Sequence, residues 1–106
     1  MKHETLVDLL QELEQTLRDL QLWQQDKPSA EALASVEPFA IDTLAFEQWL
    51  QWLFIPQMQQ LIARDSLPLS CDITPYLDEW AKKCPQDVRA LRACMVAIDE
   101  HLQRLH

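Results

Sequence analysis

The chain has 106 residues, of which 48% are apolar and none is glycine, and its formal net charge is −8. This length is usual for one domain and is enough to bury a core without metal or disulfide support. The acidity argues against nucleic-acid binding, which normally needs a basic face. The lack of glycine excludes phosphate loops and dinucleotide-binding fingerprints.

The acidic charge lies mainly in the first half of the chain. Residues 1–50 carry ten acids and three bases, a net −7, whereas residues 51–106 carry seven acids and six bases, a net −1. A partner with a neutral-to-basic surface is therefore easier to accommodate than an acidic one.

The cysteines indicate a reduced, cytoplasmic protein. The chain has three cysteines, Cys71, Cys84 and Cys94. An odd number argues against a disulfide framework, and their spacings fit no zinc-binding pattern. The N-terminal segment has acids where a secretory signal needs an unbroken apolar run, and no uncharged stretch is long enough to span a membrane. We therefore expect a cytoplasmic protein with no cofactor, no metal and no membrane association.

Residues 3–24 are expected to form the first helix. Leucines recur along it at steps of four and three, the spacing of one helix face: Leu6, Leu10, Leu13, Leu17 and Leu20. Thr5 and Asp8 resemble a capping box at its start. Residues 29–36 follow as a short helix with Ser29 as the expected N-cap.

Residues 38–58 hold five of the eight aromatic residues. The central helix is expected to begin within this segment and to continue past Pro56 to about residue 64. Asp42 is the expected N-cap, with Ile41 and Phe46 at the spacing of a hydrophobic staple. The polar side chains form one narrow strip, so the helix is expected to be nearly surrounded by protein. Pro56 removes a backbone donor and predicts a kink or a break there.

Two further helices are expected after a linker over residues 65–73. Thr74 and Pro75 are typical of a helix start, and this short helix is expected to run through Lys83. Pro85 is expected to open the last helix. Its apolar residues again step by three and four: Val88, Leu91, Met95, Ile98, Leu102 and Leu105. The pattern predicts a compact all-α bundle of about four main helices plus a short one, forming a single domain over residues 1–106.

No arrangement of side chains predicts catalysis. Cys94 and His101 lie two helical turns apart, beyond hydrogen-bond reach. Asp42 with Glu47 is interpreted as a helix cap and a surface acid rather than an acid–base pair. The acids of residues 72–79 lack the spacing of a calcium loop. We expect no catalytic and no metal-binding residue.

Two groups of residues are candidate binding sites. Trp49 and Trp52 are expected to pack in the core, with a protein-binding hot spot as the alternative if they are exposed. Together with Phe54 and Met58 they could also line a ligand pocket beneath Pro56. The second group is the basic cluster, which could dock on an acidic surface such as RNA or merely be solvated: Lys82, Lys83, Arg89 and Arg92.

The central segment resembles the YqcC-like family of small bacterial proteins of unknown function. The residues that carry the resemblance are Pro38-Phe39, Asp42-Thr43, Gln48-Trp49-Leu50-Gln51-Trp52, Ile55-Pro56 and Met58. Further matches are Trp23, Pro28, Leu67-Pro68 and Pro75-Tyr76. The family's pattern has Arg before the methionine, where this chain has Gln57. The resemblance implies a small all-helical domain. Members of the family often lie in genomes beside a tRNA pseudouridine synthase, which makes that enzyme a candidate partner.

We therefore hypothesise a non-enzymatic, cytoplasmic protein-interaction module whose partner is unknown. One alternative is an accessory factor for tRNA modification, associated with a pseudouridine synthase. Another is a small-ligand carrier with an aromatic pocket near Pro56. Direct nucleic-acid binding is not expected, and a homo-oligomer is left open.

Overall fold

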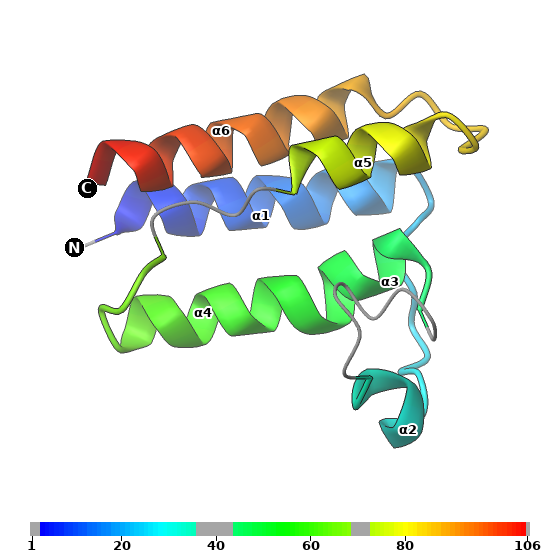
Figure 1. The fold of residues 1–106 in the computed structure, drawn as a ribbon, viewed down its shortest axis with the longest axis horizontal. Helices are drawn as coiled ribbons and strands as arrows, with labels where there is room; N and C mark the ends of the chain where they lie inside the picture. The colour runs from blue at the N-terminus through cyan, green and yellow to red at the C-terminus, as the bar shows by residue number, and fades with distance from the viewer. Residues whose placement is uncertain (1–2, 36–43, 69–72, 106) are drawn as a thin grey trace.

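The computed structural model describes residues 3–35, 44–68 and 73–105, and every regular element within these ranges is a helix (Figure 1). The elements are α1 (Glu4–Asp19), α2 (Ala30–Leu33), α3 (Phe46–Trp49), a π-helical segment (Leu50–Phe54), α4 (Ile55–Ala63), α5 (Thr74–Ala81) and α6 (Arg89–Leu105). The expected all-α bundle is confirmed.

The first and last helices pack against each other in opposite directions, so that the two ends of the chain lie at the same end of the bundle (Figure 1). Helix α5 packs against α6. Helix α4 runs alongside α1 in the opposite direction (Figure 1). A bilayer-spanning helix is absent among the described residues.

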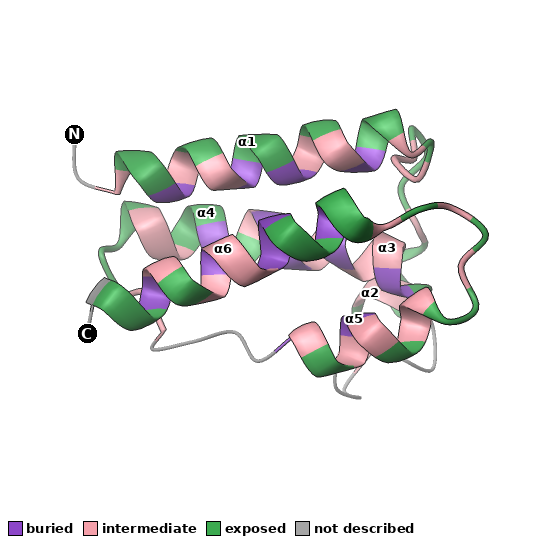
Figure 2. Ribbon diagram, turned by 90° about the horizontal axis from the view of Figure 1, so that it is seen from above, coloured by how far each residue is buried: buried purple, intermediate pink, exposed green. Residues whose placement is uncertain are grey.

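The core forms where the apolar stripes of the long helices meet, as the buried faces in Figure 2 show. Most residues of the expected stripes of α1 and α6 are buried, and Leu20 and Val88 are half-buried. The buried ones are Leu6, Leu10, Leu13, Leu17, Leu91, Met95, Ile98 and Leu102. The central helix contributes a third set: Phe46, Leu50, Phe54, Ile55 and Met58. Leu77 of α5, Ile73 just before that helix and Cys94 of α6 belong to the same cluster.

Helical backbone runs from Phe46 to Ala63, and the disturbance expected at Pro56 takes the form of a π-helical turn just before it. The N–H of Ile55 donates to the carbonyl of Leu50, five residues earlier. In a regular α-helix the Pro56 ring would press on the carbonyl of Trp52. The wider π turn relieves that crowding, so the chain stays helical through the proline.

Helix α1 ends earlier than the leucine pattern predicts, because a Schellman turn closes it. Gln21 has a left-handed φ of 61°. Its N–H donates to the Arg18 carbonyl at 3.0 Å, and the N–H of Leu22 donates to the Leu17 carbonyl at 2.9 Å. Glycine usually occupies this left-handed position, and this glycine-free chain uses glutamine. The expected continuation to residue 24 is wrong.

The end of α4 has the same construction. Asp65 has a φ of 54°, its N–H donates to the Ile62 carbonyl at 3.1 Å, and the N–H of Ser66 donates to the Leu61 carbonyl at 3.0 Å. Two left-handed residues other than glycine therefore terminate the two helices that face each other.

The helix starts differ in part from expectation. Ser29 does cap α2, since its hydroxyl accepts the N–H of Ala32 at 3.1 Å. The capping box of Thr5 and Asp8 is wrong, because His3 is the N-cap of α1 and makes no side-chain cap bond. The central helix begins at Phe46, after Ala45. The expected cap Asp42 and its neighbour Ile41 lie outside the described residues.

The two C-terminal helices are shorter than expected. Helix α5 begins at Thr74 but ends at Ala81, and α6 begins at Arg89 rather than at Pro85. The carboxylate of Asp87 accepts the backbone N–H of Arg89 at 3.1 Å. Asp87 therefore satisfies an early donor of α6 from outside the helix.

Candidate binding groove

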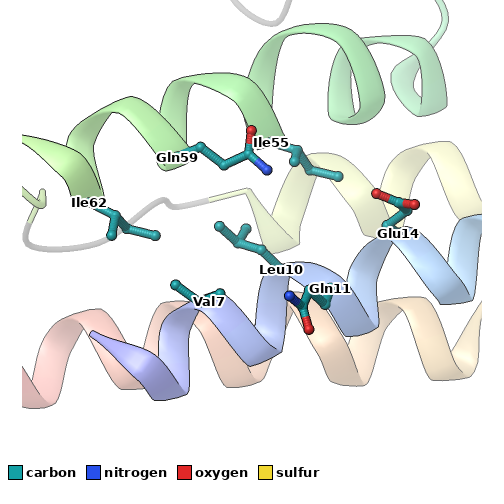
Figure 3. Close-up of a pocket in the computed structure, with 7 residues that line it drawn as sticks. All are labelled: Val7, Leu10, Gln11, Glu14, Ile55, Gln59 and Ile62. Atoms are coloured by element: carbon teal, nitrogen blue, oxygen red, sulfur yellow. The ribbon is translucent and has the colours of Figure 1, made fainter. Parts of the chain in front are cut away.

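Helices α1 and α4 leave an apolar cleft between them, which we call the slot. Its volume is ≈ 140 Å³. The side chains lining it come from facing sides of the two helices, as Figure 3 shows: Val7, Leu10, Gln11, Glu14, Ile55, Gln59 and Ile62. The other α1 members follow Val7 by three, four and seven residues and therefore share one face with it.

The floor of the slot is buried and its rim is exposed. Leu10 and Ile55 are buried, and Val7 and Ile62 are half-buried beside them, both toward the end of the slot near the start of α1 (Figure 3). Gln11 on α1 and Gln59 on α4 are both exposed. An apolar floor with polar groups at its edges is the usual composition of a binding site.

A wider hollow of ≈ 490 Å³, which we call the mouth, continues the slot toward the other end of α1. Both are lined by Glu14, Ile55 and Gln59. The mouth adds Arg18, Trp23, Gln24, Gln25, Gln51, Trp52 and Pro56. The slot and the mouth therefore form one groove along α1 and α4.

The charged side chains of the groove neutralise each other. Arg18 Nε donates to Glu14 Oε2 at 3.0 Å, and the Arg18 guanidinium lies 4.7 Å from the centre of the Trp23 ring. A cation held over an aromatic face in this way is favourable. Neither side chain is thereby left as an isolated charge for acid–base chemistry.

Polar contacts hold the groove at both ends. At one end, His3 Nε2 lies 2.7 Å from Asp65 Oδ1, which ties the start of α1 to the turn after α4. At the other, the N–H of Gln24 donates to Gln51 Oε1 at 2.8 Å and Gln51 Nε2 donates to the Gln24 carbonyl at 2.6 Å. These contacts fix the distance between the two helices that form the walls.

The side chain of Gln24 is bound as well. Its Oε1 accepts Gln48 Nε2 at 3.1 Å and Trp52 Nε1 at 3.4 Å. Gln48 Oε1 in turn accepts the backbone N–H of Ala45 at 2.7 Å, at the start of α3. The polar members of the sequence Gln48–Trp52 are therefore connected to the segment that follows α1.

The aromatic candidates divide between the core and the groove. Phe54 and Met58 are buried in the core, and half-buried Trp49 has its ring centre 6.1 Å from Phe46 and 5.4 Å from Phe54. Trp52 lines the mouth. Of the four residues considered for a pocket beneath Pro56, Trp52 is the one that the structure places in the groove.

The basic cluster is largely paired with acids. Arg92 Nε donates to Asp78 Oδ1 at 2.8 Å, and Lys82 Nζ lies 3.0 Å from Glu79 Oε1. Arg89 Nη2 lies 2.7 Å from Asp87 Oδ2. Lys83 is exposed beside Tyr76 and Trp80.

These pairs shift the titration of the acids. Hydrogen bonding to the Arg92 side chain lowers the pKa of Asp78, and the Arg89 side chain lowers the pKa of Asp87 to about 2. Three of the four cations are therefore engaged within the chain.

The remaining reactive groups do not form a catalytic arrangement among the described residues. Cys94 is buried, and burial raises the pKa of its thiol, which disfavours the reactive thiolate. No group of three potential metal ligands occurs within the described ranges. The candidate acid Asp72 lies outside them.

The pattern of the sequence did not reveal the slot. Gln11 and Glu14 fall outside the leucine stripe of α1, and Gln59 and Ile62 belong to the helix that was expected to be surrounded by protein. One signal was present: Val7 widens the apolar stripe of α1 next to Leu6. Such a widening indicates extra apolar surface but not whether another helix covers it.

Comparison with known proteins identifies the family. Residues 5–101 match the DUF446 family, whose description is "tRNA pseudouridine synthase C". An uncharacterized protein of Haemophilus influenzae is 45% identical over 92 residues, which cover 86% of each chain. YqcC of Escherichia coli K12 is 39% identical over 70 residues, 65% of this chain and 64% of that protein.

A solved structure and one longer protein are also similar. The solution NMR structure of E. coli YqcC matches with a TM-score of 0.81 at 34% identity, covering 95% of this chain and 87% of that one. A Pectobacterium carotovorum protein named tRNA pseudouridine synthase C is 44% identical over 60 residues, which are 56% of this chain but 16% of that protein. The resemblance to YqcC-like proteins is confirmed, and the chain belongs to the DUF446 family.

Proposed function

We propose that this chain is a non-enzymatic, cytoplasmic module that binds a protein partner through the groove between α1 and α4. The observation that carries the proposal is the apolar lining of this groove, which the described part of the chain leaves partly exposed from Val7 and Ile62 in the slot to Trp52 and Pro56 in the mouth. A tryptophan at the edge of an apolar cleft is a frequent anchor of protein interfaces.

The chemistry of the lining supports binding rather than catalysis. Apart from the paired Glu14 and Arg18, the groove is lined by apolar side chains and glutamines. Glutamine neither titrates nor acts as a nucleophile, but its amide both donates and accepts hydrogen bonds. Such a lining suits recognition of another polypeptide.

The partner that we favour is a tRNA pseudouridine synthase. The support is the protein of that name in which a 60-residue match takes up 16% of the sequence. A segment similar to this chain is there joined to a much longer polypeptide, which holds it at high effective concentration beside the remainder. A separate chain of the same family would need a docking surface to reach the same arrangement.

Direct RNA binding has less support. The Asp78, Glu79 and Asp87 carboxylates pair with three of the four cations that could contact phosphates. A contribution to tRNA modification would then pass through the protein partner.

Photocrosslinking in cells tests the proposal. A leucine-sized diazirine amino acid, which is too small to fill the slot, replaces Val7 in the slot or, as the matched control, Val96 on α6, which does not line the groove. We expect a discrete protein adduct from position 7 and none from position 96, and mass spectrometry identifies the adduct. If the crosslinked protein is a pseudouridine synthase, both parts of the proposal are supported. If it is another protein, the choice of partner is overturned. No adduct from position 7, or equal adducts from both, overturns the proposed function.

A further inference from the structure

We infer that the slot takes one apolar side chain from an extended, neutral-to-basic segment of the partner, while Gln11 and Gln59 bind the backbone of that segment. The inference rests on the proposed function and names the kind of polypeptide that the groove recognises. Three features of the slot carry it: its volume, its two amides and the charge of its walls.

The volume of the slot fits a single side chain. At ≈ 140 Å³ it is close to an engineered protein cavity of roughly 150 Å³ that stays dry and binds benzene. Val7, Leu10, Ile55 and Ile62 provide its apolar lining. One leucine-sized or phenylalanine-sized group therefore fills the slot, and the rest of the segment lies along the rim and in the mouth.

The two rim amides favour an extended segment over a helix. Gln11 and Gln59 stand on opposite walls, and within the described part of the chain neither side chain makes a hydrogen bond. An extended segment has backbone N–H and C=O groups free to pair, whereas a helix uses its own internally. The groove would thus add hydrogen bonds that do not depend on the sequence of the segment.

The chain already contains an example of this recognition. Gln51 holds the irregular segment after α1 by accepting the backbone N–H of Gln24 and donating to its carbonyl, at 2.8 Å and 2.6 Å. A single glutamine side chain on the central helix therefore binds both polar groups of one non-helical residue. Gln59, two helical turns further along, is placed to do the same for a partner.

The charge of the walls selects the occupant. Within the groove lining Glu14 is paired with Arg18, so the selectivity comes from the acids of α1 outside the lining. The whole of α1 carries five acids and one base, whereas α4 has no charged residue between Ile55 and Ala63. A segment with Lys or Arg beside its apolar anchor is attracted to the α1 wall. A second copy of this chain would bring the same acidic helix to the groove and be repelled.

Peptide titrations followed by ¹H–¹⁵N correlation spectra test the inference. The probes are the capped peptides Lys-Thr-Leu-Thr-Lys, Lys-Thr-Ala-Thr-Lys and Glu-Thr-Leu-Thr-Glu, each added up to millimolar concentration. We expect the first to shift the amide signals of residues 7–14 and 55–62 saturably. The alanine peptide should bind at least about ten-fold more weakly, since it lacks three carbons that the slot would bury. The acidic peptide should also bind more weakly.

Matched variants separate the two elements of the inference. Val7→Phe fills the slot and should abolish binding, whereas Val96→Phe should leave it unchanged. Gln59→Ala should weaken binding several-fold, and Gln57→Ala, an exposed glutamine that does not line the groove, should have no effect. Equal binding of the leucine and alanine peptides, or shifts centred elsewhere, overturns the inference. If crosslinking from position 7 succeeds while no peptide binds, the partner docks as a folded surface; the inference then fails and the proposed function stands.

Discussion

The side-chain amide of Gln51 binds both backbone polar groups of Gln24, which lies 27 residues earlier in the chain. Gln51 is only 4% exposed, so these two hydrogen bonds satisfy a polar side chain inside the protein. They also attach the segment after α1 to the π-helical turn of the central helix. The geometry of this end of the groove therefore depends in part on two hydrogen bonds.

Removal of this contact should destabilise the fold. Gln51→Met keeps the approximate shape of the side chain but leaves the N–H and C=O of Gln24 without their partner. We expect the free energy of unfolding to fall by about 1–3 kcal/mol, the cost of an unsatisfied buried polar group. Chemical denaturation measures the change, and Gln57→Met on the exposed face of α4 is the control. Equal losses in the two variants would show that the Gln24 contact contributes nothing.

Glycine at the left-handed end of α1 should stabilise the protein. Gln21 adopts a φ of 61°, and this left-handed conformation costs a residue with a Cβ about 1–2 kcal/mol. Glycine avoids that cost, but part of the gain is lost because glycine is more flexible in the unfolded chain. We expect Gln21→Gly to raise the free energy of unfolding by about 0.5–1 kcal/mol. Gln25→Gly, at a position without positive φ, should give no gain. A loss of stability in Gln21→Gly would contradict the Schellman geometry.

Neighbouring apolar residues of the π segment should differ in their contribution to stability. Leu50 is fully buried in the core, so Leu50→Ala should cost about 2–5 kcal/mol. Trp52 is half-buried and lines the mouth. Truncation of a buried aromatic residue typically lowers the free energy of unfolding by about 3–5 kcal/mol, and Trp52→Ala should lower it by less. Thermal or chemical unfolding of both variants compares them. A larger loss for Trp52→Ala would place that side chain in the core.

The sequence predicted the elements that follow from simple periodicity. The leucine steps of α1 and the apolar steps of α6 identified the buried faces, because a repeat of three and four aligns residues on one side of a helix. The same pattern could not locate the end of α1, since it continues to Leu20 and Trp23. There the left-handed turn at Gln21, a residue with no special turn preference, decides the boundary.

The candidate site was less accessible to sequence reasoning, for a physical reason. The sequence from Gln48 to Trp52 is rich in glutamine and tryptophan. This composition is compatible both with a ligand-binding site and with a buried hydrogen-bond network. Its polar members instead bind Gln24, a residue distant in the chain. The slot depends on the distance between α1 and α4, and this distance is set by contacts near the ends of the two helices. Such a separation has no signature in either helix alone.

The ion pair at the start of α6 should give a distinct acid titration. The Arg89 side chain holds the pKa of Asp87 at about 2, below its ordinary value of 3.8. Because the folded-state pKa is depressed, the stabilising contribution is present above about pH 4 and is lost as the pH falls toward 2. Carbon NMR of the carboxyl groups measures the titration. Arg89→Ala should return the pKa of Asp87 toward its ordinary value. Arg104 is paired with Glu100 instead, so Arg104→Ala should leave the pKa of Asp87 unchanged.

Paired cations should give the chain little affinity for tRNA. Lys82, Arg89 and Arg92 each contact a carboxylate, so few charges remain to displace counterions from a phosphate backbone. We expect no saturable binding of tRNA in mobility-shift assays at about 0.15 M salt, near the physiological ionic strength. Asp78→Asn with Asp87→Asn, which unpairs both arginines, should bind more tightly at low salt. If the wild-type chain bound tRNA strongly and Lys83→Ala abolished that binding, the chain would contact RNA directly.

The central claim is that α1 and α4 leave an apolar slot open to a ligand, and benzene tests it most directly. The measurement is a titration of methyl-labelled protein followed by NMR. We predict saturable shifts of the Val7, Leu10, Ile55 and Ile62 methyl signals, no shift at Val96, and loss of the effect in Val7→Phe. The absence of saturable shifts at these four residues, or shifts of equal size at Val96, would contradict the account.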